Sequence, residues 1–102
     1  MYPGKTKMQI RLISAKVPRN KTVVSNLPVL VGRNPTAQVH LKDAGVGQFQ
    51  CIIEQDGGMV GVRDIWGGPG IFVNGVQVRN SCLISGDRLV VGKTEFVVQY
   101  NQ

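Results

Sequence analysis

The chain has 102 residues, of which 42% are apolar; this combination fits one small globular domain spanning 1–102 and excludes a disordered chain. Its apolar runs are too short for a membrane-spanning helix and its first residues lack the apolar segment of a signal peptide, which predicts a cytoplasmic protein with no membrane partner. The net charge of +6 is uneven, because residues 1–42 contain eight lysines and arginines and no acid, and this favours either a soluble basic surface or an anionic partner.

Apolar and polar residues alternate with a period of two along most of the chain, which predicts short strands. The segments are 7–13, 22–24, 28–32, 37–41, 51–55, 59–64, 70–74, 76–78, 87–92 and 95–100. Turn residues separate them, for example Asn74-Gly75, where glycine accepts the positive φ of a tight hairpin turn. No window has a helical apolar period, so about ten short strands predict an all-β fold, an antiparallel β-sandwich.

The same alternation predicts which side chains form the core. Both cysteines, Cys51 and Cys82, lie in apolar segments and are expected to be buried thiols, although a disulfide between them stays open. Phe49 is also expected to be a core residue, whereas His40 alternates to the outer face of its strand. The predicted core consists of Met8, Ile10, Leu12, Val31, Ile53, Val62, Phe72, Leu89, Phe96 and Val98.

Function in a small sandwich is expected on the loops at its ends, and three loops are candidates: 32–37, 43–50 and 65–70. None of them contains a nucleophile with its base or a pair of carboxylates, so no catalytic activity is predicted. Two cysteines and one histidine are too few for a zinc site, which needs about four ligands, so no metal or other cofactor is predicted. Trp66 is either an exposed anchor for a partner or a ring packed over the glycines that follow it.

Four segments resemble the forkhead-associated (FHA) domain in order and spacing: "LVGRNPTAQVHL", "AGVGQFQCII", "VRDIWGGPGIFVNGVQV" and "LISGDRLVVGKTEFVV". They extend from about residue 29 to residue 100. The resemblance implies a β-sandwich of about eleven strands whose first and last strands pair. It also implies that loops at one end bind phosphothreonine peptides.

Two binding motifs of that family carry over unevenly. The arginine that contacts the peptide or its phosphate matches Arg33. The serine that hydrogen-bonds the phosphate falls on Gly47, the basic residue after it on Gln48, and the histidine that buttresses the loop on Gln50. The resemblance therefore implies that one charged contact is kept and that the phosphate-binding serine is lost.

The third motif of the family, Ser-x-Asn-Gly-Thr, falls on residues 67–71. Pro69 replaces the asparagine that holds the peptide backbone, Ile71 replaces the threonine, and only Gly70 is retained. The glycines keep the tight turn, while the side-chain donors are gone. The peptide or phosphate site implied by the resemblance is Arg33, Asn34, Gly47, Gln48, Gly68, Pro69 and Gly70.

Three functions remain open at the level of sequence. The favoured one is a monomeric FHA-like protein–protein interaction module in signalling that has weak or lost phosphothreonine recognition. The first alternative is a working phosphothreonine-binding domain that uses Arg33 and backbone N–H groups of the glycine-rich segment 45–47. The second is binding of a polyanion or nucleic acid through basic residues 5–42; nucleic acid is less expected, because the chain has only six aromatic residues and no nucleic-acid motif. The expected partner is a protein or phosphoprotein.

Overall fold

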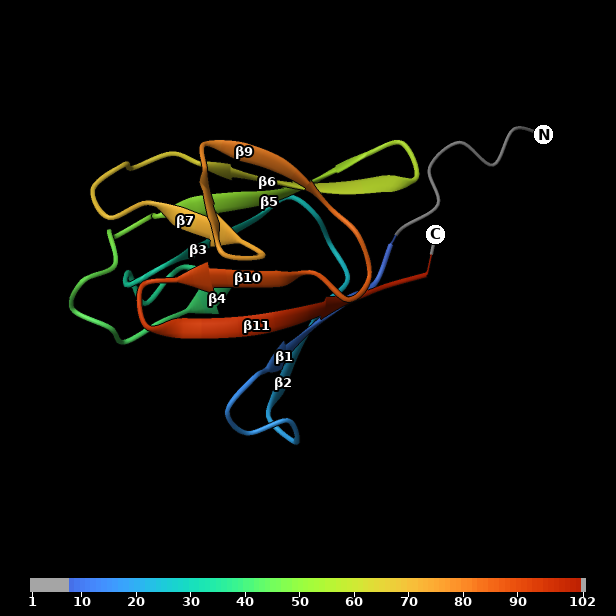
Figure 1. Ribbon diagram of the computed structural model, residues 1–102, viewed down its shortest axis with the longest axis horizontal. Helices are drawn as coiled ribbons and strands as arrows, with labels where there is room; N and C mark the ends of the chain where they lie inside the picture. Colours follow the sequence, from blue (N-terminus) through green and yellow to red (C-terminus); the bar gives the residue numbers. More distant parts are fainter. Residues whose placement is uncertain (1–7, 102) are drawn as a thin grey trace.

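The computed structural model describes residues 8–101, which form two packed β-sheets (Figure 1). No helix among these residues is long and apolar enough to cross a membrane. Lys5 and Lys7, which contribute to the basic N-terminal half of the sequence, lie outside the described residues. The strands are β1 (Ile10–Ser14), β2 (Lys21–Val24), β3 (Val29–Gly32), β4 (Val39–His40), β5 (Cys51–Asp56), β6 (Met59–Asp64), β7 (Ile71–Val73), β8 (Val76–Val78), β9 (Asn80–Leu83), β10 (Arg88–Val91) and β11 (Thr94–Gln99).

The strands are arranged in the order β2-β1-β11-β10-β7-β8 in one sheet and β4-β3-β5-β6-β9 in the other. β1 and β11 pair antiparallel, with Arg11 opposite Gln99, which confirms the expected pairing of the first and last strands. The β-sandwich is therefore confirmed, but the expectation that it is antiparallel throughout is wrong at one pair. β3 and β4 run parallel, because the loop 33–38 returns the chain beside the end of β3 and leaves only the two residues of β4 to pair there.

β9 is the strand that the sequence pattern does not predict. Its sequence, NSCL, buries only Leu83, so it lacks the apolar alternation that marks the other strands. A single residue, Arg79, separates it from β8, and at this point the chain passes from one sheet to the other. The pairing of β9 with β6 holds it in place, and this long-range contact has no local signature in the sequence.

The core lies between the two sheets and contains the predicted side chains with one exception. Phe72 is half-buried, because β7 turns its neighbours Ile71 and Val73 inward and leaves the phenyl ring on the outer face. A strand of three apolar residues does not show which of its faces is buried. The predicted residues that are buried are Met8, Ile10, Leu12, Val31, Ile53, Val62, Leu89, Phe96 and Val98.

The two cysteines lie in different environments and are not joined by a disulfide. Cys51 is buried as expected, and burial, followed by the nearby charge of Asp64, raises the pKa of its thiol to about 12. Cys82 is exposed, so the expectation that it is buried is wrong. Alternation in β9 explains the difference, because Leu83 takes the inward position and Cys82 faces outward.

Candidate functional site

The candidate loops gather at one end of the sandwich, where β3, β4, β6 and β10 end (Figure 1). We call this end the loop surface and define it as residues 33–38, 41–50, 65–70, 79 and 92–93. Two backbone hydrogen bonds join its first two loops: Arg33 N donates to Gly47 O at 3.0 Å, and Asn34 N donates to Gln48 O at 3.0 Å. The loops approach so closely that a Cβ atom on Gly32 would lie 2.2 Å from Gln48 O.

Gln50 connects the second loop to the third. Its side chain is 1% exposed. Its Oε1 accepts the N–H of Gly47 at 3.0 Å, and its Nε2 donates to Gly67 O at 3.0 Å and to Asp64 Oδ1 at 3.1 Å. The family places a buttressing histidine at this position. Gln50 supplies such a buttress through its amide, so its departure from the family motif preserves the loop arrangement.

Asp64 shapes the third loop, a role that the sequence analysis missed. Its Oδ1 accepts the backbone N–H of Trp66 at 3.1 Å and that of Gly67 at 2.9 Å. Gly67, Gly68 and Gly70 have φ values of 84°, 60° and 77°, a region that favours glycine. A carboxylate placed two and three residues before free N–H groups is a common turn device and was the available signal.

The Trp66 ring satisfies both interpretations that the sequence left open. Its side chain is 53% exposed, yet the ring lies against the backbone of two loops. A Cβ atom on Gly47 would lie 2.3 Å from Trp66 Cδ2, and one on Gly68 would lie 2.5 Å from Cζ3. Trp66 therefore occupies the space beside Gly47 into which a side chain at that position would project.

Arg33 is exposed at the start of the first loop, directly after β3. Its Nε donates to Val46 O at 3.2 Å, which orients the guanidinium, while its two terminal amino groups have no partner among residues 8–101. His40 is exposed as predicted, and its Nε2 lies 3.0 Å from Arg33 O. The Arg33 side chain is thus held through its Nε, while its two terminal amino groups are free to contact a ligand.

The other predicted site residues contribute differently. Asn34 is engaged within its own loop, since its Oδ1 accepts the N–H of Thr36 at 2.9 Å and the Thr36 hydroxyl at 2.7 Å. Gln48 and Pro69 are exposed, and Pro69 O accepts from Gln77 Nε2 at 3.2 Å. Gly68 is exposed too, whereas Gly70 is buried and only shapes the turn.

Phe49, which was expected in the core, is half-buried beside the buried Gln50. Because the amide of Gln50 takes the inward position that links the loops, the neighbouring phenyl ring turns partly toward solvent.

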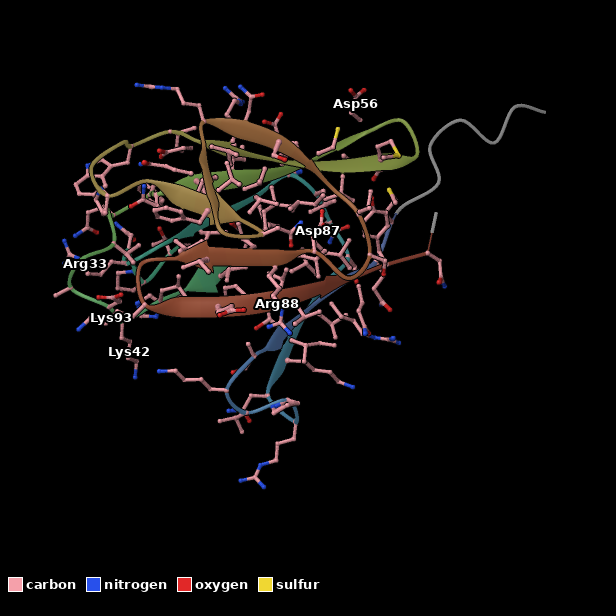
Figure 2. All side chains as sticks on the ribbon, viewed as in Figure 1. Arg33, Lys42, Asp56, Asp87, Arg88 and Lys93 are labelled. Carbon is pink, nitrogen blue, oxygen red and sulfur yellow. The ribbon has the colours of Figure 1, made fainter. Side chains whose placement is uncertain are left out.

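Positive charge predominates at the loop surface. Arg33, Lys42 and Lys93 project from the same end of the molecule in Figure 2. Arg79, between β8 and β9, lies beside the third loop, where it lines a hollow together with Gly67 and Gly68. The two ion pairs found among the described residues, Arg63–Glu54 and Arg88–Glu95, include none of these four cations.

The carboxylate of Asp43 is used within the loop surface. It accepts the N–H of Gly45 at 2.9 Å and that of Lys93 at 2.5 Å. These two bonds, that of Gly45 first, hold the pKa of Asp43 below its usual value, so the group is ionised at neutral pH.

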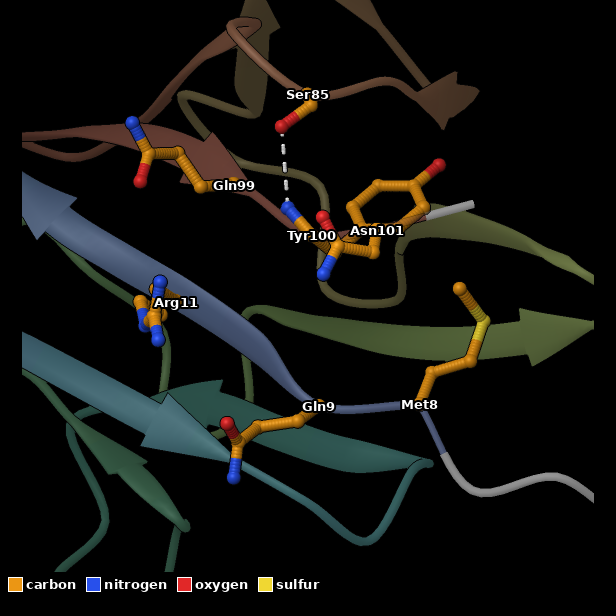
Figure 3. Close-up of a pocket in the computed structure, with 7 residues that line it drawn as sticks. All are labelled: Met8, Gln9, Arg11, Ser85, Gln99, Tyr100 and Asn101. Carbon is orange, nitrogen blue, oxygen red and sulfur yellow. Dashed lines mark hydrogen bonds between the residues drawn. The ribbon is translucent and has the colours of Figure 1, made fainter.

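Two surface hollows lie at opposite ends of the sandwich. One of about 400 Å³ lies beside the third loop and is lined by Asp64, Gly67, Gly68, Gln77, Val78 and Arg79. Another of about 360 Å³ lies near the start of β1 and the end of β11, where Ser85 Oγ accepts the N–H of Tyr100 at 3.1 Å (Figure 3). Neither hollow holds a catalytic set, and residues 8–101 contain no group of three or more metal-ligating side chains placed to share an ion.

The sequence model of the FHA domain matches residues 29–92, which is more than half of the chain. One solved structure, from a structural and functional analysis of phosphothreonine-dependent FHA domain interactions, has a TM-score of 0.83 and 24% identity and covers 92% of this chain and 98% of that chain. The FhaA FHA domain complexed with the intracellular domain of Rv3910 has a TM-score of 0.77 and 25% identity, with coverage of 90% and 99%. The FHA domain of the CT664 protein from Chlamydia trachomatis has a TM-score of 0.80 and 17% identity, with coverage of 95% and 100%. No curated protein matches the sequence. The match of the family model, together with the shared sandwich, establishes that this chain belongs to the FHA domain family.

Proposed function

We propose that this chain is a protein interaction module whose loop surface binds a partner segment with weak or no dependence on phosphothreonine. The observation that carries the proposal is the Trp66 ring beside Gly47, with 2.3 Å between Trp66 Cδ2 and the position that a Cβ atom would take. The family uses a serine side chain at this place to hold the phosphate. Here the ring fills the space that such a side chain needs.

The loss of two hydrogen bonds sets the scale of the effect. A hydrogen bond to a charged group contributes about 1.5–3 kcal/mol, so losing the serine contact and the asparagine contact would cost about 3–6 kcal/mol. Tenfold in affinity corresponds to about 1.4 kcal/mol, so phosphopeptide binding would weaken by a factor of about 10² to 10⁴. Arg33, which keeps its free terminal amino groups, would supply only part of this energy.

The alternative of a backbone phosphate site is less well supported, because its donors are already engaged. Gly45 N donates to Asp43 Oδ1, Val46 N to Asp43 O, and Gly47 N to Gln50 Oε1. The ionised Asp43 carboxylate at this loop also opposes a second anion there. Polyanion binding through the basic N-terminal half is less well supported too, since Arg33 and Lys42 lie at the loop surface while Lys16 and Arg19 lie on the separate β1–β2 hairpin.

A phosphothreonine peptide library screened beside its unphosphorylated counterpart tests the proposal. Titration calorimetry on the best peptide in both forms should give Kd values within about tenfold of each other, because little of the binding energy depends on phosphate. Micromolar binding by the unmodified domain that disappears without the phosphate would contradict the proposal.

A variant that restores the family's chemistry provides the matched positive control. It combines Trp66→Ala, Gly47→Ser and Pro69→Asn. The φ of Gly47 lies outside the left-handed region, so the ring of Trp66 is the obstacle to a serine there. We expect phosphate discrimination to rise by a factor of about 10² in the triple variant, and not in Trp66→Ala alone.

A further inference from the structure

We propose that Trp66 is the anchor by which the loop surface holds an unphosphorylated acidic peptide. In this arrangement a bulky apolar side chain of the peptide packs on the indole ring, and its carboxylates face Arg33 and the neighbouring cations. This inference rests on the proposed function and names the chemistry of its partner.

Trp66 is exposed and also fixed in position, which is the first observation behind the proposal. Its side chain is 53% exposed, and that of the adjacent Ile65 is 45% exposed. The ring packs against Gly47 and Gly68, and Asp64 holds the loop backbone through two N–H groups. A rigid aromatic side chain loses little conformational freedom when it binds, so it contributes more of its contact energy to affinity.

The indole nitrogen gives the anchor a direction. The Nε1–H of Trp66 forms no hydrogen bond within residues 8–101, so a ligand that covers the ring finds a donor beside an apolar surface. A peptide provides both groups that this arrangement suits, an apolar side chain for the ring and a backbone carbonyl for the N–H.

Charge decides which peptide fits. Arg33, Lys42 and Lys93 (Figure 2), together with Arg79 beside the third loop, have no ion-pair partner among the described residues. Of the carboxylates at this end, Asp43 accepts N–H groups of Gly45 and Lys93, and Asp64 accepts those of its own loop. The loop surface is therefore electropositive, so it attracts an acidic segment and repels a basic one.

A protein segment fits this surface better than a nucleic acid does. Single-stranded nucleic acids bind along a series of aromatic rings, each stacked on a base. Trp66 is the only exposed side chain among the phenylalanines, tyrosines and tryptophan of residues 8–101, and its exposed neighbour is the aliphatic Ile65. One ring with an aliphatic neighbour is suited to one apolar side chain.

The test begins with a random unphosphorylated peptide library, from which the domain should enrich Asp or Glu close to a bulky apolar residue. Because Trp66 is the only tryptophan of the chain, its fluorescence reports directly on the proposed anchor. Adding the enriched peptide should move the emission to shorter wavelength as the ring leaves water. The same peptide with lysine in place of its acidic residues should produce no such change.

Substitutions then separate the anchor from the rest of the molecule, with Kd measured by calorimetry. Trp66→Ala should weaken binding about 30-fold or more, as removal of a central aromatic anchor does, and Trp66→Phe should restore most of the affinity. Arg33→Ala should weaken it about 10-fold. Two controls, Ile84→Ala at the opposite end and Arg19→Ala on the β1–β2 hairpin, should leave the Kd unchanged. Thermal midpoints show that each variant is folded.

The outcomes distinguish this inference from the proposed function. Unphosphorylated binding that survives Trp66→Ala, or enriched peptides without acidic residues, would overturn the anchor and leave the proposed function standing. Binding that requires phosphothreonine, or a library that enriches nothing, would overturn both. If a single-stranded oligonucleotide at equal concentration competes with the peptide, or if Arg19→Ala weakens peptide binding as much as Arg33→Ala does, the ligand class is a polyanion and the peptide proposal is wrong.

Discussion

Gly47 and Gly68 leave room for the Trp66 ring, and neither could carry a side chain without displacing it. Beside the family motif, the glycines of residues 67–70 look like a loss of polar chemistry. In the structure Gly68, like Gly47, is also a packing requirement of one aromatic ring, since a Cβ atom at either of these two glycines would lie 2.5 Å or less from it. Gly68 therefore leaves space for the Trp66 ring, while Gly67 and Gly70 provide the positive φ that the turn requires.

The two thiols should differ strongly in reactivity. Burial raises the pKa of Cys51 to about 12, so this thiol stays protonated and inaccessible, whereas Cys82 faces solvent on β9. A thiol reagent such as 5,5′-dithiobis(2-nitrobenzoate) should modify one cysteine in the native protein and both after unfolding in urea. Cys82→Ser should abolish the native reaction. Modification of Cys51 at a similar rate in the folded state would show that the core position assigned to it is wrong.

At the scale of the element, the loops behave as one unit because Gln50 connects them. Replacing it with leucine keeps a similar volume but leaves the buried N–H of Gly47 and the half-buried carbonyl of Gly67 without this partner. A buried group left unsatisfied costs about 1–3 kcal/mol, so we expect Gln50→Leu to lower the free energy of unfolding by about 2–4 kcal/mol. Urea denaturation measures this loss, and Gln99→Leu, at an exposed position on β11, should change it by less than about 0.5 kcal/mol. A loss as small as that of the control would mean that Gln50 does not support the loops.

A second connection, through Asp43, should make stability depend on acidity. Asp43 ties the second loop to the β10–β11 turn, and the N–H groups of Gly45 and Lys93 lower its pKa. A lowered pKa means that the contribution is fully present above the unfolded value of about 3.9 and is lost as the pH falls through the folded pKa. Urea denaturation at a series of pH values should therefore show that wild type and Asp43→Asn converge in stability under acid. A constant difference between them would contradict this assignment.

The elements also show what the sequence could and could not predict. Alternation placed the hairpin strands β6 and β8 at their observed bounds, because an apolar period is local information. It missed β9, whose place depends on pairing with β6, and it assigned Phe72 to the wrong face. The family motifs singled out Arg33 and Gly47, whose role in binding stays a prediction, and they gave Gln50 only as a replaced histidine. The hydrogen bonds of Gln50 to Gly47 and Gly67, and the contact of Trp66 with Gly47 and Gly68, depend on how the loops are placed in the folded structure, which the sequence pattern does not show.

At the scale of the whole molecule, stability comes from the apolar layer between the sheets, and Phe96 tests it. Its side chain is buried on β11, opposite Leu89 of β10. Phe96→Ala should cost about 3–5 kcal/mol through lost burial and a cavity, a large part of the total stability of a small domain. Phe72→Ala, on the outer face, should cost less than about 2 kcal/mol in the same denaturation experiment. Equal losses would mean that the two rings do not differ in burial as described.

The pairing of β1 with β11 has a mechanical consequence. Because the two strands are antiparallel neighbours, the start of β1 and the end of β11 lie together, away from the loop surface (Figure 1). A force that draws these two points apart would break the Arg11–Gln99 pair first, then Leu12–Val98, and so on along the register, one rung at a time. Such peeling loads few hydrogen bonds at once, so the domain would unfold at low force when it is pulled from the start of β1 and the end of β11 in opposite directions. Attachment at only one of these two points would leave the loop surface directed away from the attachment.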